Sequence, residues 1–304
     1  MYKPTPEEIA KVKGMGFLID KTTYCHFNGR VLTVNGRIDA DKLTVIAEAA
    51  KKYAGSAVGL TTRQTIEIQH IPYENIEPLI EFLREHDLEI GGTGPKVRPI
   101  VSCKGTTCQY GLIDTFSLSE KIHHVFYKGY HEVKLPHKFK IAVGGCPNNC
   151  VKPDLNDLGV IGHKKPIFNT EICRGCKVCQ VEKACPVKAA RVENGKITSP
   201  ECNGCGRCDG KCPFGAIEGY NVGYRVYVGG RWGKKTAMGR PLQTIFASED
   251  EVMKLIESAI LFFRLYGEAG ERFADTIKRV GFEETERILT SGEMIEKKDE
   301  ILAK

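Results

Sequence analysis

The spacing of its cysteines constrains this chain more than any other sequence feature. The chain has 304 residues and 13 cysteines, twelve of which form three groups of four. In two groups, three cysteines lie two residues apart and a fourth is followed by proline. Thiolates at this spacing suit the corners of one iron–sulfur cluster, whereas zinc sites use separated pairs that close a tetrahedron. We therefore favour clusters over structural zinc at group one (Cys173, Cys176, Cys179, Cys185) and group two (Cys202, Cys205, Cys208, Cys212).

Groups one and two resemble the cysteine motif of bacterial ferredoxins with two [4Fe–4S] clusters. In that motif the fourth cysteine of each run binds the cluster of the other run. We therefore expect Cys212 to complete the first cluster and Cys185 to complete the second. The last gap of group one is two residues longer than that of group two. We expect the extra residues to form a small loop without loss of a ligand.

Group three lies upstream and reads C-x4-C, a long gap, then C-x3-C. It consists of Cys103, Cys108, Cys146 and Cys150. A ferredoxin motif accounts for only about 50 residues, so the rest of the chain must form other domains. A hydrophobic content of 41% and a charged content of 27% are typical of a folded globular protein.

Composition also excludes several classes of protein. The longest strongly apolar stretch, residues 259–263, is far shorter than the roughly 20 residues that cross a bilayer, and the N-terminus lacks an apolar secretory core. The formal net charge is +6, but each ligated cluster carries about −2, so three clusters would bring the total to roughly zero. We expect a cytoplasmic protein that spans no membrane, binds no nucleic acid and uses its thiols for metal rather than disulfides.

The first 90 residues predict a small α+β domain. We expect a strand over 29–38, a helix over 39–53, a strand around 65–69 and a helix over 75–86. Such an order indicates helices on one face of a sheet. The first helix should bury Leu43, Ile46, Ala47 and Ala50, and the second strand should bury Ile66 and Ile68 while Thr65, Glu67 and Gln69 face away.

The glycine-rich stretch 91–95 marks a predicted domain boundary. It does not fit a dinucleotide-binding motif, so we expect no nicotinamide site. Farther on, residues 224–230 predict a strand, and Ser248 with Glu251 predicts a capping box that opens a helix to about Tyr266. The ferredoxin motif is thus an insertion. The predicted domains are 1–92, then 93–162 together with 221–304, and the inserted module 163–220.

Six segments outside the module resemble the sirohaem-dependent sulfite and nitrite reductases. With its ferredoxin insertion, the chain is most similar to the catalytic component of anaerobic sulfite reductases, their C subunit, from about residue 10 to residue 290. The resemblance implies a ferredoxin-like half followed by a sirohaem and [4Fe–4S] domain. The segments are GLTTRQTIEIQ (59–69), VRPIVSC (97–103), HKFKIAVGGCPNNC (137–150), DLGVIG (157–162), YVGGRWGKKT (227–236) and GERFAD (270–275).

The resemblance also implies that group three binds a third [4Fe–4S] cluster and that Cys150 bridges this cluster to the sirohaem iron. An isolated structural cluster is the alternative. The family usually has five residues in the first gap of group three, and this chain has four, where Gly105 is expected to allow a tighter turn. Weaker candidates for sirohaem contacts are Thr62, Gln64, Asn148, Asn149 and Arg231. Asn148 and Asn149 could equally be turn residues. No role is assigned to His70 or His163.

Four basic residues match the substrate site of the family: Arg63, Arg98, Lys138 and Lys140. Strand alternation places Lys138 and Lys140 on one face. Their mutual repulsion should lower the pKa of at least one lysine and make it a better proton donor near neutral pH. The arginines should stay charged and bind oxygen atoms of the substrate.

These features predict a six-electron sulfite reductase. The alternatives are reduction of nitrite to ammonia, and an electron-transfer polyferredoxin without sirohaem. Because no flavin or nicotinamide motif is present, a separate flavin or ferredoxin protein must donate the electrons. The larger members of the family fuse two related halves, so we expect this single half to form a homodimer in which the basic residues of one protomer face Cys150 of its partner.

Overall fold

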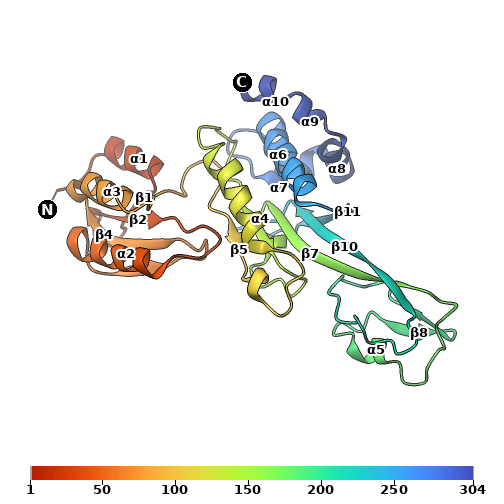
Figure 1. Cartoon of the computed structure of the whole chain (residues 1–304). Helices are drawn as coiled ribbons and strands as arrows, with labels where there is room; N and C mark the ends of the chain where they lie inside the picture. Colours follow the sequence, from red (N-terminus) through yellow and green to blue (C-terminus); the bar gives the residue numbers. More distant parts are fainter. Residues whose placement is uncertain (1, 304) are drawn as a thin grey trace.

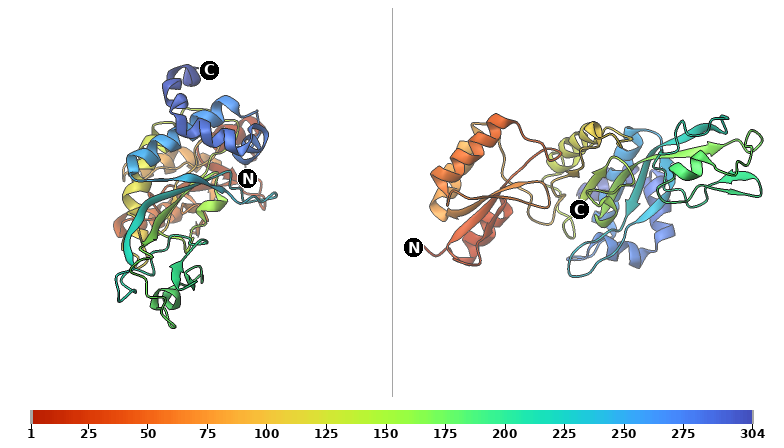
Figure 2. Two further views of the ribbon diagram at one scale, coloured as in Figure 1. Left: turned by 90° about the vertical axis from the view of Figure 1, so that its right-hand side faces the viewer. Right: turned by 90° about the horizontal axis from the view of Figure 1, so that it is seen from below.

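The computed structural model describes residues 2–303 and contains three sheets (Figure 1). The N-terminal sheet has strand order β1-β2-β4-β3, and the central sheet has order β11-β10-β7-β6-β5. A small hairpin, β8-β9, lies in the segment that contains cysteine groups one and two. Figure 2 shows the same three parts from two further directions.

The N-terminal domain is an α+β domain with helices packed on a sheet, as predicted, and the structure shows that this sheet is antiparallel. Its fully buried residues include Phe17, Phe27, Ile68 and Leu79. Helix α2 packs against α3 and β4. The elements are α1 (Pro6–Gly14), β1 (Phe17–Ile19), β2 (His26–Val31), α2 (Ala40–Tyr53), β3 (Val58–Leu60), β4 (Ile66–Pro72), the 3₁₀ turn η1 (Tyr73–Asn75) and α3 (Ile76–Arg84).

Three details of this domain differ from the sequence prediction. Strand β2 ends at Val31 because the chain turns at Asn35 and Gly36, both of which have positive φ. Helix α2 buries Ile46, Ala49 and Ala50, whereas Leu43 and Ala47 are exposed. Thr65 is buried rather than outward-facing, and its hydroxyl forms a hydrogen bond of 2.7 Å with that of Thr61.

The central domain places helices around a mixed sheet. Strands β5, β6 and β7 are parallel, and β7, β10 and β11 are antiparallel. The strands are β5 (Val101–Ser102), β6 (Ile141–Gly144), β7 (Leu158–Phe168), β10 (Ile217–Val228) and β11 (Arg240–Phe246). The helices are η2 (Gly105–Thr107), α4 (Thr115–Ile122), the π-helical η3 (His123–Lys128), η4 (Pro153–Leu155), α6 (Glu249–Tyr266), α7 (Phe273–Val280), α8 (Phe282–Ser291), α9 (Glu293–Glu296) and α10 (Lys298–Ala303).

Helix α6 begins and ends where the sequence predicts. The Ser248 hydroxyl accepts a hydrogen bond from the Glu251 amide at 3.2 Å. The Glu251 carboxylate accepts from the Ala247 amide at 2.7 Å, one residue before the position that a capping box uses. In residues 2–303 no helix has the length and apolar character needed to cross a bilayer.

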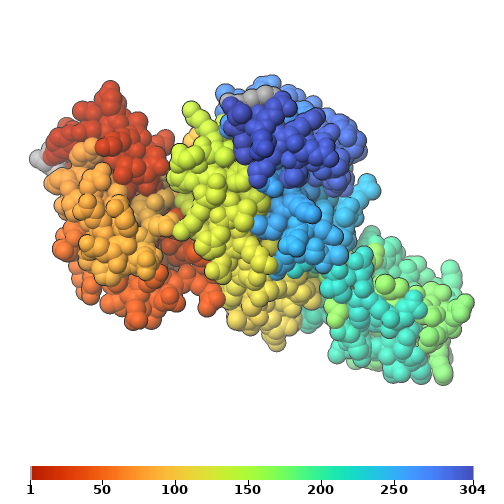
Figure 3. Space-filling model, turned by 45° about the horizontal axis from the view of Figure 1, so that its top comes forward, coloured from red at the N-terminus to blue at the C-terminus, as the bar shows by residue number. Residues whose placement is uncertain are grey.

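Strands β7 and β10 extend beyond the central sheet as a two-stranded arm. Their pairing runs from Leu158 and Val228 at the sheet to Phe168 and Ile217 at the far end. Between those far ends lie α5 (Gln180–Ala184), β8 (Arg191–Glu193) and β9 (Lys196–Thr198). Figure 3 shows this segment as a lobe that projects from the rest of the molecule. The last gap of group one is two residues longer than that of group two, and all of its residues belong to helix α5. The expected small loop was therefore wrong.

Phe139 joins the sheet to the helices. Its side chain is fully buried, and its ring lies 5.0 Å from that of Phe273 and 5.9 Å from that of Phe263. Since Lys138 and Lys140 flank it in sequence, burial of Phe139 turns both lysines away from this core.

Phe139→Ala is therefore expected to lower the free energy of unfolding by about 3–5 kcal/mol, because it leaves a cavity among aromatic rings. Urea denaturation followed by circular dichroism measures the change. Leu60→Ala serves as the control, since Leu60 is 88% exposed and should change stability by less than about 0.5 kcal/mol. Equal stability of the two variants would contradict this packing.

Candidate functional site

The candidate site is built on two parallel strands, β5 and β6. Before the strands begin, Val97 and Phe139 form a parallel bridge, and the Arg98 amide donates to the Phe139 carbonyl at 2.8 Å. This pairing brings Arg98 beside Lys138 and Lys140. At the other end, Cys103 follows β5 and donates its amide to the Val143 carbonyl at 3.0 Å. The basic residues thus precede the strands, and Cys103 and Cys146 follow them.

A cavity of about 190 Å³ collects the predicted basic residues. Arg63, Arg98, Lys138 and Lys140 all line it, together with Thr65, Gly92 and Pro99. Sequence reasoning missed a fifth cation, Arg30, which also lines the cavity. Arg30 is partly neutralised by Glu67 at 3.1 Å across β2 and β4. Its position depends on that long-range strand pairing, which no local sequence signal reveals.

Arg63 is held in place by three groups of the central domain. Its Nη1 donates to Asn156 Oδ1 at 2.7 Å, and its Nη2 donates to the carbonyls of Pro99 and Ile141. Burial lowers the pKa of Arg63 to about 10, so the guanidinium stays charged at neutral pH. These bonds fix a positive charge against the start of β6.

Arg98, like Arg63, is hydrogen-bonded to a backbone carbonyl and has its pKa lowered by burial. Its Nη1 donates to the Gly92 carbonyl, and burial lowers the pKa of Arg98 to about 10. Within the described residues, the Nε atoms of Arg63 and Arg98 are buried and have no hydrogen-bond partner. Buried polar groups without partners are costly. The pair therefore suits a bound anion that accepts these hydrogen bonds.

The two lysines differ in their electrostatic setting. Burial lowers the pKa of Lys140 to about 8, with the charges of Arg63 and Lys138 as smaller causes of the same shift. Burial is also the main cause that lowers the pKa of Lys138. The predicted direction is therefore correct, but burial is the main cause, and repulsion by Lys138 is only a smaller cause of the lowered pKa of Lys140. Lys140 is suited to lose and regain a proton near neutral pH.

A buried ion pair is hydrogen-bonded to the backbone of Lys140. Asp157 and Arg272 are both buried, and Arg272 Nη2 lies 2.9 and 3.0 Å from the two carboxylate oxygens. Asp157 Oδ2 also accepts from the Lys140 amide at 2.9 Å. Burial raises the pKa of Asp157, and Arg272 opposes that rise. Arg272 lies in the segment GERFAD, but no local sequence pattern reveals that it supports Lys140.

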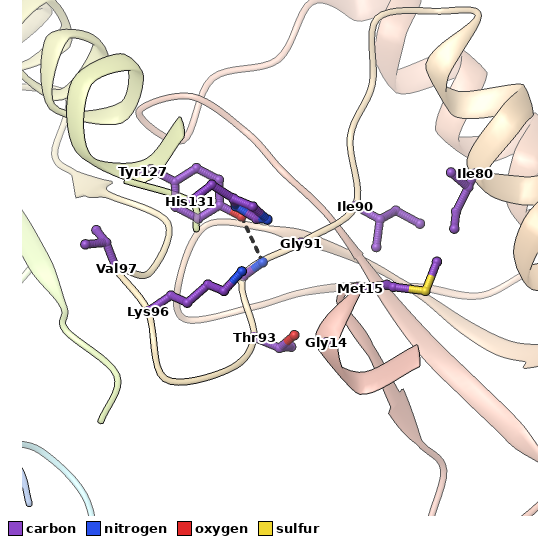
Figure 4. A pocket seen from close by; sticks show the side chains of 11 residues that line it. Gly14, Met15, Ile80, Ile90, Gly91, Thr93, Lys96, Val97, Tyr127 and His131 are labelled. Carbon is purple, nitrogen blue, oxygen red and sulfur yellow. Dashed lines mark hydrogen bonds between the residues drawn. The ribbon is translucent and has the colours of Figure 1, made fainter. Parts of the chain in front are cut away.

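Gly92 connects this cavity with a second one, shown in Figure 4. The Gly92 amide donates to the Tyr127 hydroxyl at 2.9 Å, while its carbonyl accepts from Arg98. In the second cavity Tyr127, His131 and Lys96 lie opposite Met15 and Ile80 (Figure 4). The glycine-rich stretch therefore helps to fix Arg98.

Group three gathers at the carboxyl ends of β5 and β6. Burial raises the pKa of Cys103 and of Cys146, and neighbouring thiols of the group contribute to each shift. The Gly145 amide donates to Cys103 Sγ at 3.1 Å. Cys150 is exposed at the edge of the group. Four thiols with an amide donor to sulfur fit the ligand set of an iron–sulfur cluster.

The short gap of group three forms the 3₁₀ turn η2. The Cys108 amide donates to the Gly105 carbonyl. A Cβ on Gly105 would lie 2.8 Å from the Gly145 Cα, and Gly105 does not have a positive φ. The chain therefore makes the expected tight turn, and the close approach of the Gly145 backbone is a further reason for the glycine.

The last cysteine of each of groups one and two lies beside the other group, as the ferredoxin motif would require. One cavity is lined by Cys173, Cys176, Cys179 and Cys212. Burial raises the pKa of Cys208 to about 11, and Cys202, Cys205 and Cys185 add to the rise. Among residues 2–303, no three His, Cys, Asp or Glu side chains are placed to hold a single metal ion.

Backbone amides donate to sulfur in both groups. The four donors lie 3.3 to 3.5 Å from the sulfur atoms. Such bonds to thiolates influence the reduction potential of a cluster. The pairs are Ile197 with Cys173, Ala190 with Cys185, Gly204 with Cys202, and Ala216 with Cys212.

The weaker candidates have mostly structural partners. The Gln64 side chain forms two hydrogen bonds with the Ser102 backbone, at 2.7 and 2.9 Å. Arg231 pairs with Asp275 at 2.7 Å. Asn149 has a φ of 57° and donates to Asp154 at 2.8 Å, as a turn residue would. Thr62 is exposed, and Asn148 lies in the turn between Cys146 and Cys150.

Comparison with known proteins identifies the family. Residues 93–297 match the model of the nitrite and sulphite reductase 4Fe-4S domain, and residues 20–86 match that of the nitrite/sulfite reductase ferredoxin-like half domain. The chain therefore belongs to the nitrite and sulphite reductase family. It is an oxidoreductase with the mixed α/β fold of that family.

Two relatives are each 33% identical to the chain. One is the coenzyme F420-dependent sulfite reductase of Methanocaldococcus jannaschii, aligned over 88% of this chain. The chain spans only 42% of that protein's length. The other is the C subunit of the anaerobic sulfite reductase of Salmonella typhimurium, for which the alignment covers 73% of this chain and 69% of the relative.

Two solved structures share the fold. Dissimilatory sulfite reductase I has a TM-score of 0.67 at 21% identity, and the match covers 86% of this chain and 68% of that one. The NirA protein of Mycobacterium tuberculosis has a TM-score of 0.66 at 16% identity, with coverage of 95% and 47%.

Lys140 should titrate near pH 8 instead of its usual value of 10.5, because burial disfavours its charged form. Proton titration of isotope-labelled lysine side chains by NMR measures the midpoint. Lys140→Arg assigns the resonance by removing it. If every lysine resonance titrates above about pH 10, the cavity does not desolvate Lys140 as described.

Proposed function

We propose that the chain is a sulfite reductase that reduces sulfite to sulfide with six electrons. The cavity of Arg63, Arg98, Lys138 and Lys140 carries this proposal, because a small oxyanion needs fixed positive charge and a proton source. Two relatives that align with most of the chain are sulfite reductases by name. A polyferredoxin that only carries electrons has no use for such a cavity.

The cysteine groups support three [4Fe–4S] clusters, with groups one and two in an inserted module over residues 163–220. The flanking parts, 1–92 and 93–162 with 221–304, are the proposed ferredoxin-like half and the sirohaem domain. Group three would hold the third cluster, and Cys150 would also serve sirohaem. When bound, this coupled pair supplies electrons to the sulfur of sulfite. Among the weaker candidates we keep Thr62 and Asn148 for sirohaem contacts, because both are exposed, whereas Gln64, Asn149 and Arg231 are bonded to other residues.

The basic residues have separate roles in this proposal. The free Nε groups of Arg63 and Arg98 bind substrate oxygen atoms, and their guanidinium groups hold the negative charge. Lys140 delivers protons to the departing oxygens, since its pKa of about 8 allows it to be protonated at pH 7 and to release the proton readily. Lys138 maintains the positive potential beside it.

The strands suggest how an active site is completed. The four-residue strand β6, about 13 Å of extended chain, lies between Lys140 and the bend that contains Cys146. Basic residues and group three therefore lie at opposite ends of the same strands. A twofold homodimer would bring the basic residues of one protomer to the Cys150 of its partner. Electrons would enter from a separate flavin or ferredoxin protein through the module.

Steady-state turnover with reduced methyl viologen tests the substrate. We expect a higher kcat/KM for sulfite than for nitrite, and one sulfide formed per six electrons. Lys140→Met should lower kcat/KM for sulfite by about 100-fold or more because proton delivery is lost. Lys51→Met is the control, since Lys51 is an exposed lysine. A preference for nitrite would contradict the proposal.

Mixed dimers test the proposed completion across the protomers. A dimer of one Lys138→Ala chain and one Cys150→Ala chain should contain one intact site and one doubly altered site. It should recover about half of the normal activity, whereas each homodimeric variant stays inactive. Differently tagged chains allow the hybrid to be purified and its iron content checked. Hybrids that bind the iron expected for the complete cysteine group three of the Lys138→Ala chain, and yet stay inactive, would place the whole site within one chain.

A further inference from the structure

His163 lies on β7 just beyond the residues that pair with β6, at the first residue of the proposed module 163–220. It is 1% exposed, and burial lowers its pKa to about 4, so the ring is neutral at pH 7. Within the described part of the chain, its Nδ1 is buried and has no hydrogen-bond partner. Burying a polar ring nitrogen without a partner is unfavourable. Such an atom points to a group that the polypeptide itself does not supply.

The His163 ring lies against the loop of cysteine group two. A Cβ on Gly204 would lie 2.2 Å from His163 Nδ1, and Gly204 stands between Cys202 and Cys205. The Gly204 amide donates to Cys202 Sγ at 3.4 Å. The nitrogen without a partner thus faces the glycine whose amide donates to a sulfur atom of this group.

Adjacent residues of β7 fix this contact. The Lys164 amide donates to the Gly204 carbonyl at 2.7 Å, and Lys164 forms a parallel bridge with Cys205. Gly204 has a φ of +73° and lies so close to the ring that a side chain at this position would collide with His163. The loop and the strand therefore fit each other closely, and His163 cannot turn away without separating them.

On the other side of His163, β7 reaches cysteine group three. A Cβ on Gly162 would lie 2.5 Å from the Gly145 carbonyl oxygen, and the Gly145 amide donates to Cys103 Sγ at 3.1 Å. Gly162, His163 and Lys164 thus connect the two groups through a few contacts. Of the groups in the module, group two is the one that this connection reaches.

We propose that His163 donates an N–H hydrogen bond to the cluster held by group two and thereby raises its reduction potential. The inference rests on the proposed function, since it requires the cluster to be present. Reduction adds one electron from an external donor and makes the cluster more negative, with no bond broken. An N–H donor stabilises that added charge. The reduced cluster is then favoured at the position next to group three.

Redox titration of the holoprotein with dithionite, followed by electron paramagnetic resonance, tests this role. In His163→Leu one cluster should show a roughly tenfold lower ratio of reduced to oxidised form at a fixed potential, a shift of about 59 mV for a one-electron couple. The other clusters should be unchanged. His123→Leu is the matched control, because His123 is also buried, at 2% exposed, with a pKa lowered to about 4 by burial, but it stacks on Tyr127.

Wild-type protein with ¹⁵N-labelled histidine gives an independent measurement. Pulsed electron paramagnetic resonance of the reduced protein should detect a histidine nitrogen coupled to one cluster, and this signal should persist in His123→Leu. Because this measurement uses the wild-type protein, it tests the proposed hydrogen bond even if His163→Leu loses a cluster. Absence of the coupling, or unchanged potentials in a fully loaded His163→Leu, would overturn the inference. Wild-type protein that contains no module clusters would instead overturn the proposed function.

Discussion

The parallel pairing of β5 with β6 determines the arrangement of the candidate functional groups in the central domain. It aligns the chain from Val97 and Phe139 to Ser102 and Val143. Arg98, Lys138 and Lys140 come before the strands, and Cys103 and Cys146 come after them. Phe139 stabilises this register because its ring packs among those of Phe263 and Phe273. Charge and thiols are thereby held at opposite ends of one sheet.

Burial then gives the basic residues their chemical character. The same enclosure that leaves the Nε atoms of Arg63 and Arg98 without hydrogen-bond partners in the described part of the chain also lowers the pKa of Lys140. The N-terminal domain contributes Arg30 and Arg63 to the cavity, so the site depends on the docking of two domains. The arm of β7 and β10 acts at the opposite end of the sheet, where the thiols lie. It brings the module's second cysteine group close to the third.

Much of this organisation could be predicted from local sequence patterns. Cysteine spacing predicted the exchange of Cys185 and Cys212, and alternation predicted the shared face of Lys138 and Lys140. The roles of Arg30 and of the Asp157–Arg272 pair could not be predicted, since both depend on contacts between distant segments. For the same reason the buried positions of α2 were predicted only in part: Leu43 and Ala47 lie on the side that the sheet leaves uncovered. The role of Gly105 likewise depends on Gly145, which is distant in sequence.

Cofactor content tests the central claim most directly. Protein purified without oxygen should be analysed for iron and acid-labile sulfide per chain, and its absorption spectrum recorded. We predict about 13 irons and an isobacteriochlorin-type band in the red, as three [4Fe–4S] clusters and one sirohaem require. About eight irons without that band would leave only the ferredoxin module, and would contradict a sulfite reductase built on the third cysteine group.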